Sequence, residues 1–151
     1  MPVKTTAFLA PLSRDHHFGL LFCWKIRMGY RKKIEANRIE SYAKWFYSTY
    51  LKAHFDVEEN HVFPILGDQH KLVKQALSDH RKLRRLFKGA NEISKNIGLI
   101  EEKLEQHIRF EERILFIEIQ NSASPEELNK ILESHCDQNH TSQEWGDEFW
   151  T

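Results

Sequence analysis

Apolar residues recur every three or four positions through most of this chain, which is the spacing of one buried face of an α-helix. The pattern predicts four long helices, over residues 13–31, 37–64, 68–89 and from 91 or 94 to 120, and a short fifth helix over 125–135. Strand signals are nearly absent, and the four prolines fall at predicted helix ends. Because short turns join the long helices, neighbouring helices should be antiparallel. The predicted fold class is all-α: an up-down-up-down four-helix bundle with a short fifth C-terminal helix.

Capping residues predict several of these helix boundaries. Asn37 followed by Glu40 resembles a capping box at the start of the second helix. Asp68 is expected to cap the third helix. Ser124 before Pro125 combines an N-cap residue with a proline in the first turn, so this pair should open the fifth helix.

The same pattern divides the chain into three parts. Residues 1–11 are expected to form an N-terminal arm, residues 12–121 the four-helix bundle, and residues 122–151 a C-terminal helix and tail. The end of the tail has no clear period, but it is aromatic. Trp145, Phe149 and Trp150 predict that the tail packs on the bundle.

Charge and composition exclude several classes of partner. The 22 basic and 22 acidic residues cancel, so no long-range field favours nucleic acid. No apolar run approaches the ~20 residues that a membrane span requires, and the N-terminal residues lack the apolar core of a signal peptide. Cys23 and Cys136 are too few for a disulfide framework and are expected to be reduced thiols. We therefore expect a cytoplasmic protein, a monomer or homodimer, with no nucleic-acid or membrane partner.

Six side chains that could ligate a metal lie on the stripes that Leu, Ile, Phe and Tyr otherwise occupy. They are His16, His54, Glu58, His80, His107 and Glu111. In two cases a histidine stands four residues before a glutamate, so the two side chains share a helix face. An Asp-His pair precedes each of these motifs. The chain therefore shows a two-fold repeat of Asp-His followed by His-x-x-x-Glu.

Burial of these six groups needs a physical explanation. An unpartnered buried polar group costs roughly 2–7 kcal/mol, in a domain whose net stability is ~5–15 kcal/mol. A pair of bound cations would satisfy the six groups, because imidazoles and carboxylates suit iron, manganese or zinc, and two carboxylates can bridge two ions. The competing interpretation is a salt-bridged polar layer without metal.

These motifs, in this order, resemble the hemerythrin-like HHE cation-binding family over about residues 12–120. The resemblance rests on Arg14-Asp15-His16-His17, His54-Phe55-x-x-Glu58-Glu59, Asp79-His80-x-x-Leu83 and His107-x-x-x-Glu111-Glu112. It implies a bundle that holds a non-haem di-iron centre, with the four histidines as terminal ligands and Glu58 and Glu111 as bridges. Members of the family act in dioxygen binding, in oxygen or iron sensing, and in responses to oxidative or nitrosative stress.

Two histidine assignments keep alternatives. His17 could replace His16, although the Asp-His pair in the third helical motif matches His16 better. His61 lies seven residues after His54 on the same predicted face, so it could be an additional ligand or a histidine at the solvent edge.

One carboxylate assignment also has an alternative. The oxygen-carrying hemerythrins place this carboxylate five residues after the histidine, which would select Glu112. Helical geometry favours Glu111, because it lies about 40° from His107 around the helix axis, against about 140° for Glu112.

One departure from the family pattern bears on function. The oxygen carriers have a second histidine one turn from that of the third helix, where this chain has Ala76 and Arg84. One fewer nitrogen ligand leaves an open coordination position. The first hypothesis is therefore a protein that binds two iron ions, with manganese or zinc as substitutes. Its partner would be dioxygen or another small diatomic or peroxide ligand, in redox-linked binding or sensing.

Two further hypotheses belong to other classes. The open position also suits a di-iron enzyme, a peroxidase or a nitric-oxide-reducing oxidoreductase. The sequence offers no Gly-rich phosphate loop and no nucleophile motif, so no catalytic residue is predicted and a binding protein is favoured over an enzyme. The third hypothesis is a structural bundle that binds zinc, or an interaction bundle without metal.

The predicted third helix is strongly basic, with Lys71, Lys74, Arg81, Lys82, Arg84, Arg85 and Lys88. The fourth helix offers several glutamates. We interpret these as solvated or mutually paired faces, with a docking surface as the alternative.

Overall fold

The structure, a computed structural model, describes residues 9–88, 93–136 and 145–151. Within these residues the chain forms helices and no strand. The first long helix is α1 (Ala10–Arg31), and the third is α4 (Lys71–Lys88). The second consists of α2 (Ala36–Phe46), η1 (Tyr47–Leu51), α3 (Lys52–Val57), η2 (Glu58–Val62) and η3 (Phe63–Ile65) in succession. The fourth consists of α5 (Ile93–Phe110), η4 (Glu111–Leu115) and α6 (Phe116–Ser122), and α7 (Pro125–Cys136) follows.

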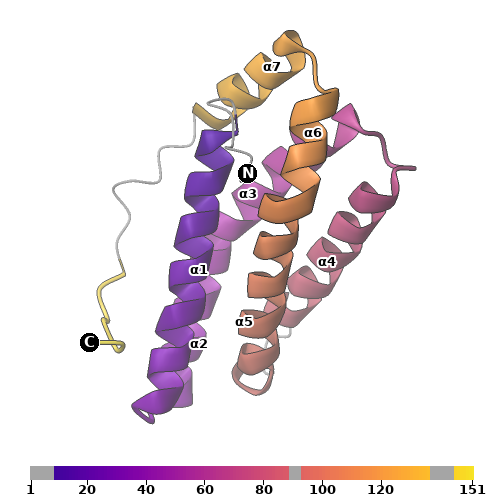
Figure 1. Cartoon of the computed structure of the whole chain (residues 1–151). Coiled ribbons are helices and arrows are strands. Elements are labelled where there is room, and N and C mark those ends of the chain that lie inside the picture. The colour runs from indigo at the N-terminus through magenta and orange to yellow at the C-terminus, as the bar shows by residue number, and fades with distance from the viewer. Residues whose placement is uncertain (1–8, 89–92, 137–144) are drawn as a thin grey trace.

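The long helices alternate in direction (Figure 1). In that view α1 descends, α2 and α3 ascend, α4 descends, and α5 and α6 ascend, while α7 crosses the upper end of the bundle. This arrangement confirms the predicted all-α, up-down-up-down bundle with a fifth C-terminal helix. None of the described helices is long and apolar enough to cross a bilayer.

The helix boundaries confirm one predicted cap. The Ser124 hydroxyl accepts a hydrogen bond from the Glu127 backbone N–H (3.1 Å), and the Glu127 carboxylate accepts one from the Ser124 N–H (2.9 Å). This reciprocal pair is a capping box at the start of α7.

Two other predicted caps were wrong. α2 begins one residue before Asn37, after Glu35, and no side chain caps it. Asp68 lies in the turn that follows Gly67 (φ 89°), so the chain is not yet helical there. His70 caps α4 instead, because its Nδ1 accepts a hydrogen bond from the Leu72 N–H (3.1 Å). Asn91, a candidate start of the fourth helix, lies outside the described residues.

The buried apolar residues form two clusters, one toward each end of the bundle. The first includes Phe22, Phe46 and Leu104. The second includes Leu12 and Leu115 and lies toward α7. On each long helix the polar residues predicted as ligands stand between members of the two clusters. The fold therefore places one buried polar layer across the middle of an otherwise apolar core.

Aromatic residues near the C-terminus pack against α1 and α2. Phe149 is buried and contacts the ring of Tyr42, with their centroids 5.5 Å apart. A Cβ on Gly29 would lie 2.9 Å from Phe149 Cε1, so a side chain there would displace this ring. Arg38 donates two hydrogen bonds to Asp147 (2.8 and 2.6 Å), which ties the same segment to α2.

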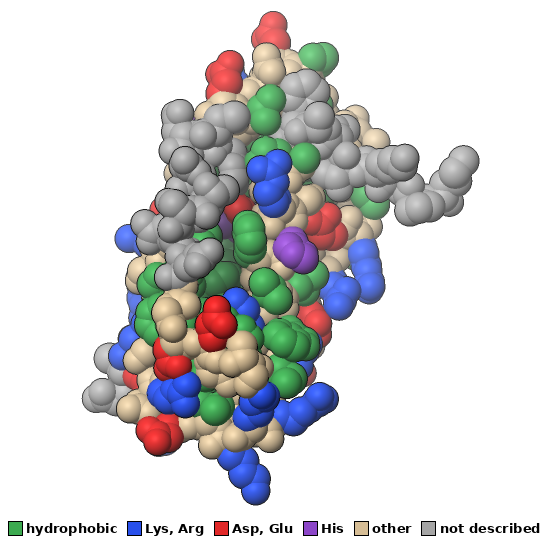
Figure 2. Space-filling model, turned by 90° about the vertical axis from the view of Figure 1, so that its left-hand side faces the viewer, with side chains coloured by type: hydrophobic (Ala, Val, Ile, Leu, Met, Phe, Trp, Pro, Cys, Tyr) green, Lys and Arg blue, Asp and Glu red, His purple; other side chains and the backbone are tan. Residues whose placement is uncertain are grey.

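The outer face of α1 is partly apolar. Figure 2 shows hydrophobic side chains gathered on this side of the molecule. On α1 itself, Phe18, Leu21 and Trp24 have exposed fractions of 36, 36 and 46 %.

Candidate metal centre

Each long helix contributes one histidine to the buried polar layer. His16 lies on α1, His54 on α3, His80 on α4 and His107 on α5, and all four are at most 4 % exposed. Glu58 and Glu111 are fully buried at the first residues of η2 and η4. The six residues predicted as ligands are therefore all placed inside the bundle.

Both buried glutamates begin a π-helical turn. Such a turn holds one residue more than an α-helical turn, and it occurs frequently at functional sites. The extra residue shifts the helix face that points inward, so the core resumes at Val62 and Phe63 after Glu58, and at Leu115 and Phe116 after Glu111. The ideal α-helical angles used for the sequence prediction do not include this shift.

The inward atoms form two overlapping quartets. The first quartet is His16, His54, Glu58 and Glu111, and the second quartet is Glu58, His80, His107 and Glu111. Within each quartet the four candidate ligand atoms lie within 4.8 Å of one another. Each histidine Nε2 lies 2.9–3.3 Å from a carboxylate oxygen of Glu58 or Glu111. Each quartet could thus hold a metal ion, and the two quartets share Glu58 and Glu111.

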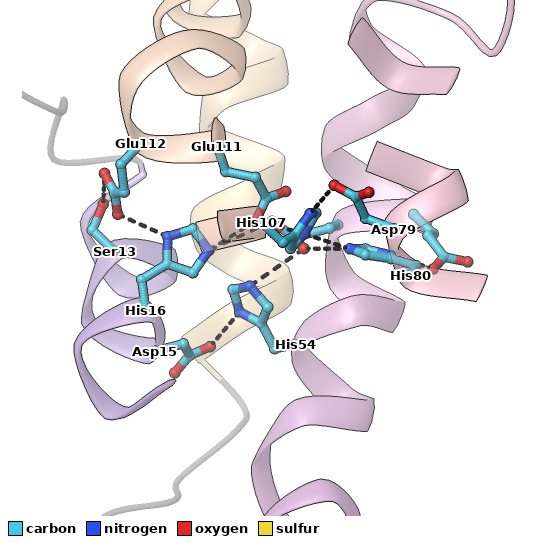
Figure 3. Close-up of polar contacts among 11 residues, drawn as sticks. Ser13, Asp15, His16, His54, Asp79, His80, His107, Glu111 and Glu112 are labelled. Atoms are coloured by element: carbon cyan, nitrogen blue, oxygen red, sulfur yellow. Dashed lines mark hydrogen bonds and ion pairs between the residues drawn. The ribbon is translucent and has the colours of Figure 1, made fainter. Parts of the chain in front are cut away.

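Each of the four buried histidines also forms a hydrogen bond through its other ring nitrogen, Nδ1 (Figure 3). The Nδ1 bonds join His16 to Glu112 (2.8 Å), His54 to Asp15 (3.0 Å), His80 to Glu59 (2.6 Å) and His107 to Asp79 (2.9 Å). An ionised carboxylate only accepts, so Nδ1 carries the hydrogen in each case. In a neutral ring this fixes the tautomer that turns the Nε2 lone pair toward the centre, the orientation that histidines have in metal sites.

We call the four carboxylates that accept these Nδ1 bonds the outer carboxylates. Each bond joins one helix to a neighbouring helix. Asp15 precedes the histidine of α1 but holds the histidine of α3, and Glu59 follows the buried glutamate of η2 but holds the histidine of α4. Asp79 precedes the histidine of α4 but holds that of α5, and Glu112 follows the buried glutamate of η4 but holds that of α1. The four bonds therefore close a ring around the bundle.

The sequence analysis missed the role of Asp15, Glu59 and Asp79. A signal was present, because both Asp-His pairs and both Glu-Glu pairs belong to the repeated motifs. Their partners could not be assigned from the sequence, since each bond joins two helices.

The outer carboxylates of the second quartet also pair with basic residues. Lys103 Nζ lies 2.7 Å from Asp79, and Arg84 Nη1 lies 2.7 Å from Glu59. Beside the first quartet, Glu112 accepts a hydrogen bond from the Ser13 hydroxyl (3.3 Å), which carries no charge.

Several buried atoms at the centre are left without hydrogen bonds. Among the described residues, His54 Nε2, both oxygens of Glu58 and Glu111 Oε2 are buried and form none. In addition, His80 Nε2 and His107 Nε2 lie 3.1 Å apart while both Nδ1 atoms donate to carboxylates. Two neutral rings would direct their lone pairs at each other, which is unfavourable unless a proton or a metal ion lies between the two nitrogens. The donor set therefore fits bound metal ions.

The acid–base behaviour of the metal-free centre shows its excess of negative charge. Burial lowers the pKa of His107, but Glu111 and Asp79 outweigh it and raise the pKa to about 10. Burial likewise lowers the pKa of His54, and Glu58 is the main group that raises it well above its ordinary value. Without metal these imidazoles therefore hold protons at neutral pH. Cations that bind there must displace them.

The two quartets differ in their access to space. A pocket of about 10 Å³, close to what one water-sized molecule needs, borders His16, His54 and His107. Its remaining walls are largely apolar and include Leu51 and Ile108. Of the second quartet only His107 borders this pocket, and His80 is fully buried. Phe55 stacks on the His80 ring at 3.8 Å between centroids, and Phe63 lies at 5.4 Å.

The alternative ligands of the sequence analysis lie outside both quartets. His17 and His61 are exposed. Glu112 belongs to the outer layer, where it holds His16 Nδ1. Ala76 is fully buried in the apolar cluster toward α7, and Arg84 pairs with Glu59, so neither supplies a further nitrogen ligand.

Comparison with known protein families agrees with this geometry. The Hemerythrin family, described as the hemerythrin HHE cation binding domain, matches residues 25–116. This range includes five of the six predicted ligands and leaves out His16. Searches of curated proteins and of solved structures found no match. The family match covers more than half of the chain, and the buried histidines and glutamates could hold metal. The chain therefore belongs to the hemerythrin HHE cation-binding domain family.

Proposed function

We propose that this chain is a cytoplasmic protein that binds two iron ions, bridged by Glu58 and Glu111, for dioxygen or redox-linked binding or sensing. The observation that carries the proposal is the pair of overlapping quartets. They present buried atoms without hydrogen bonds at two positions that share the same carboxylates. Carboxylate-bridged metal pairs in helical bundles are built from such residues on facing helices.

The charges of the centre support two ions rather than one. Six carboxylates surround the centre: two belong to the quartets, Glu58 and Glu111, and four hold the histidine Nδ1 atoms, Asp15, Glu59, Asp79 and Glu112. Arg84 and Lys103 lie against two of these carboxylates. Glu58, Glu111 and Glu112 alone carry three negative charges, which is more than one divalent cation would balance with the histidines neutral.

The pocket supports a small exogenous ligand. Two histidines and two shared carboxylates would complete a structural zinc site, which is closed and tetrahedral. Iron accepts additional ligands, and the pocket beside His16 and His54 offers space of about 10 Å³ next to the first quartet. In this proposal the chain's own residues hold the ions, orient the imidazoles and restrict access to small molecules.

Iron reconstitution tests the proposal. Purified metal-free protein is loaded with ferrous iron without air, the metal content is measured by mass spectrometry, and absorption spectra are recorded before and after air is admitted. We expect about two iron ions per chain and new near-ultraviolet absorption of carboxylate-bridged ferric iron. Less than one ion per chain, or preferential retention of zinc with no spectral response to air, would contradict the proposal.

A second candidate function is peroxide consumption or nitric oxide reduction at the same centre. The pocket favours it, since a cavity that admits a diatomic ligand also admits peroxide. Steady-state turnover by the iron-loaded protein, compared with the same concentration of free iron, separates an enzyme from a binding protein. No turnover above free iron with either substrate would exclude this candidate.

A further inference from the structure

The α4 helix carries a concentration of positive charge that the metal centre does not explain. It holds seven basic residues and one acidic residue, although the whole chain has no net charge. Arg81, Arg84, Arg85 and Lys88 line a shallow groove of about 440 Å³. Their spacing of three, four and seven residues puts them on one helix face.

Most of this charge is available to a partner. Arg81, Arg85 and Lys88 are exposed, and no ion pair among the described residues involves them. Exposed cations without counter-ions repel one another, so an anionic group that enters the groove would relieve this repulsion. Guanidinium groups bind carboxylates in a two-pronged geometry, which makes arginine clusters suitable for acidic segments.

Arg84 links the groove to the metal centre. Its Nη1 lies 2.7 Å from Glu59 Oε2, and His80 Nδ1 lies 2.6 Å from the same oxygen. The two donors therefore share one acceptor atom, so a stronger bond from one draws electron density away from the other. A cation on His80 Nε2 makes the Nδ1–H a stronger donor, and this would weaken the hold of Glu59 on Arg84.

We propose that the groove formed by Arg81, Arg84, Arg85 and Lys88 docks an acidic segment of a partner protein, and that Arg84 couples docking to metal occupancy. A protein segment fits better than nucleic acid, because these four lining residues provide no aromatic ring for base stacking. From Arg81 to Lys88 the groove also covers only about 10 Å of the helix, at 1.5 Å per residue, which suits a short peptide segment. The docking is independent of the proposed metal function, whereas the coupling rests on it.

Docking is tested with a fluorescein-labelled peptide of alternating glutamate and glycine, by fluorescence anisotropy with the metal-free protein. We expect saturable binding that weakens as salt is added. The double variant R81Q/R85Q should lower the affinity about tenfold, the equivalent of about 1.4 kcal/mol. The matched control K71Q/K74Q removes the same charge from α4 outside the groove and should change the affinity less than about twofold. No saturable binding, or equal losses in the two variants, would overturn the proposal.

Two competing probes test the class of partner. A single-stranded RNA oligonucleotide and vesicles containing phosphatidylserine are measured with the same variants. We expect both to bind more weakly than the peptide. Tighter binding of either probe that R81Q/R85Q abolishes would overturn the choice of a protein segment. Circular dichroism confirms that the variants are folded.

The coupling is tested by repeating the peptide titration with iron-loaded protein. We expect an affinity about threefold higher than for the metal-free form, and R84Q should remove this difference while Arg81 and Arg85 still bind. Equal affinities in the two forms of the unmodified protein would overturn the coupling. A protein that takes up no iron but binds the peptide would overturn the proposed metal function and leave docking established.

Discussion

The two quartets use the same kinds of ligand in different surroundings. In the first quartet, His16 and His54 border a small apolar pocket, and Glu112 is bonded to the uncharged hydroxyl of Ser13. In the second quartet only His107 borders this pocket, His80 is stacked against Phe55, and both outer carboxylates are paired with basic side chains. Both histidines of the first quartet therefore have space beside them, whereas in the second quartet one histidine is covered by aromatic rings.

This difference shows that a repeated motif does not produce repeated chemistry. The two Asp-His and His-x-x-x-Glu motifs supply equivalent histidines and glutamates, but the residues packed around them decide what each half can do. We expect the first quartet to accept the exogenous ligand. The second quartet, in which Phe55 covers His80, would mainly anchor an ion.

The largest effect is expected from a residue that both quartets share. Glu58→Gln removes one buried negative charge that both halves share, so metal affinity should fall more than about a hundredfold in both, since loss of an outer partner alone costs about 10–100-fold. Metal content by mass spectrometry should drop below one ion per chain. The exposed Glu126→Gln is the control. Retention of two ions by E58Q would show that Glu58 does not bridge.

Replacing one histidine in each half separates the quartets. His54→Leu and His80→Leu should each lower the metal content from about two ions to about one. Azide, added as a spectroscopic probe of iron, should still perturb the spectrum of H80L and should not perturb that of H54L. Loss of both ions in either variant would show that the halves do not fill independently, and an azide response in H54L would contradict the assignment of the pocket.

Replacing one outer carboxylate should change metal affinity less than these substitutions do, and in one half only. Asp15→Asn weakens the hydrogen bond to His54, and Asp79→Asn that to His107. Each variant should lower metal affinity about 10–100-fold in its own half, measured by competition with a chelator. Asp68→Asn, in an exposed turn, should leave the affinity unchanged. Equal weakening of both ions by one variant would contradict a local role.

The smallest effect concerns the cation behind Asp79. Lys103→Gln removes a positive charge 2.7 Å from that carboxylate, so the second quartet should bind its ion about threefold to tenfold more tightly. Isothermal titration measures the change, which should shrink at high salt. Lys95→Gln, on the exposed side of α5, is the matched control. Weaker binding in K103Q would show that Lys103 acts by positioning Asp79 rather than by its charge.

The sequence predicted the fold because apolar spacing alone determines which helix faces are buried. The same spacing singled out six polar residues on those faces, and the structure brings them into the two quartets. A buried histidine or glutamate is conspicuous in a stripe of leucines, so this part needed no three-dimensional information.

The other features of the site could not be predicted from the sequence, because most of them depend on how the helices pack against one another. The π-helical turns at Glu58 and Glu111 break the regular period, so no periodic template contains them. The bond from Asp15 to His54 joins residues 39 positions apart, and its existence depends on the register between α1 and α3. The pocket and the stacking of Phe55 on His80 likewise arise from packing between helices.

The ring of outer hydrogen bonds limits the stage of protein synthesis at which the proposed metal ions could bind. His16 on α1 is held by Glu112, which is synthesised 96 residues later. A chain still emerging from the ribosome, or one cleaved between α4 and α5, lacks both the shared Glu111 and the closing bond of the ring. We therefore expect the protein to take up its full complement of metal only after all four helices have been synthesised and packed together.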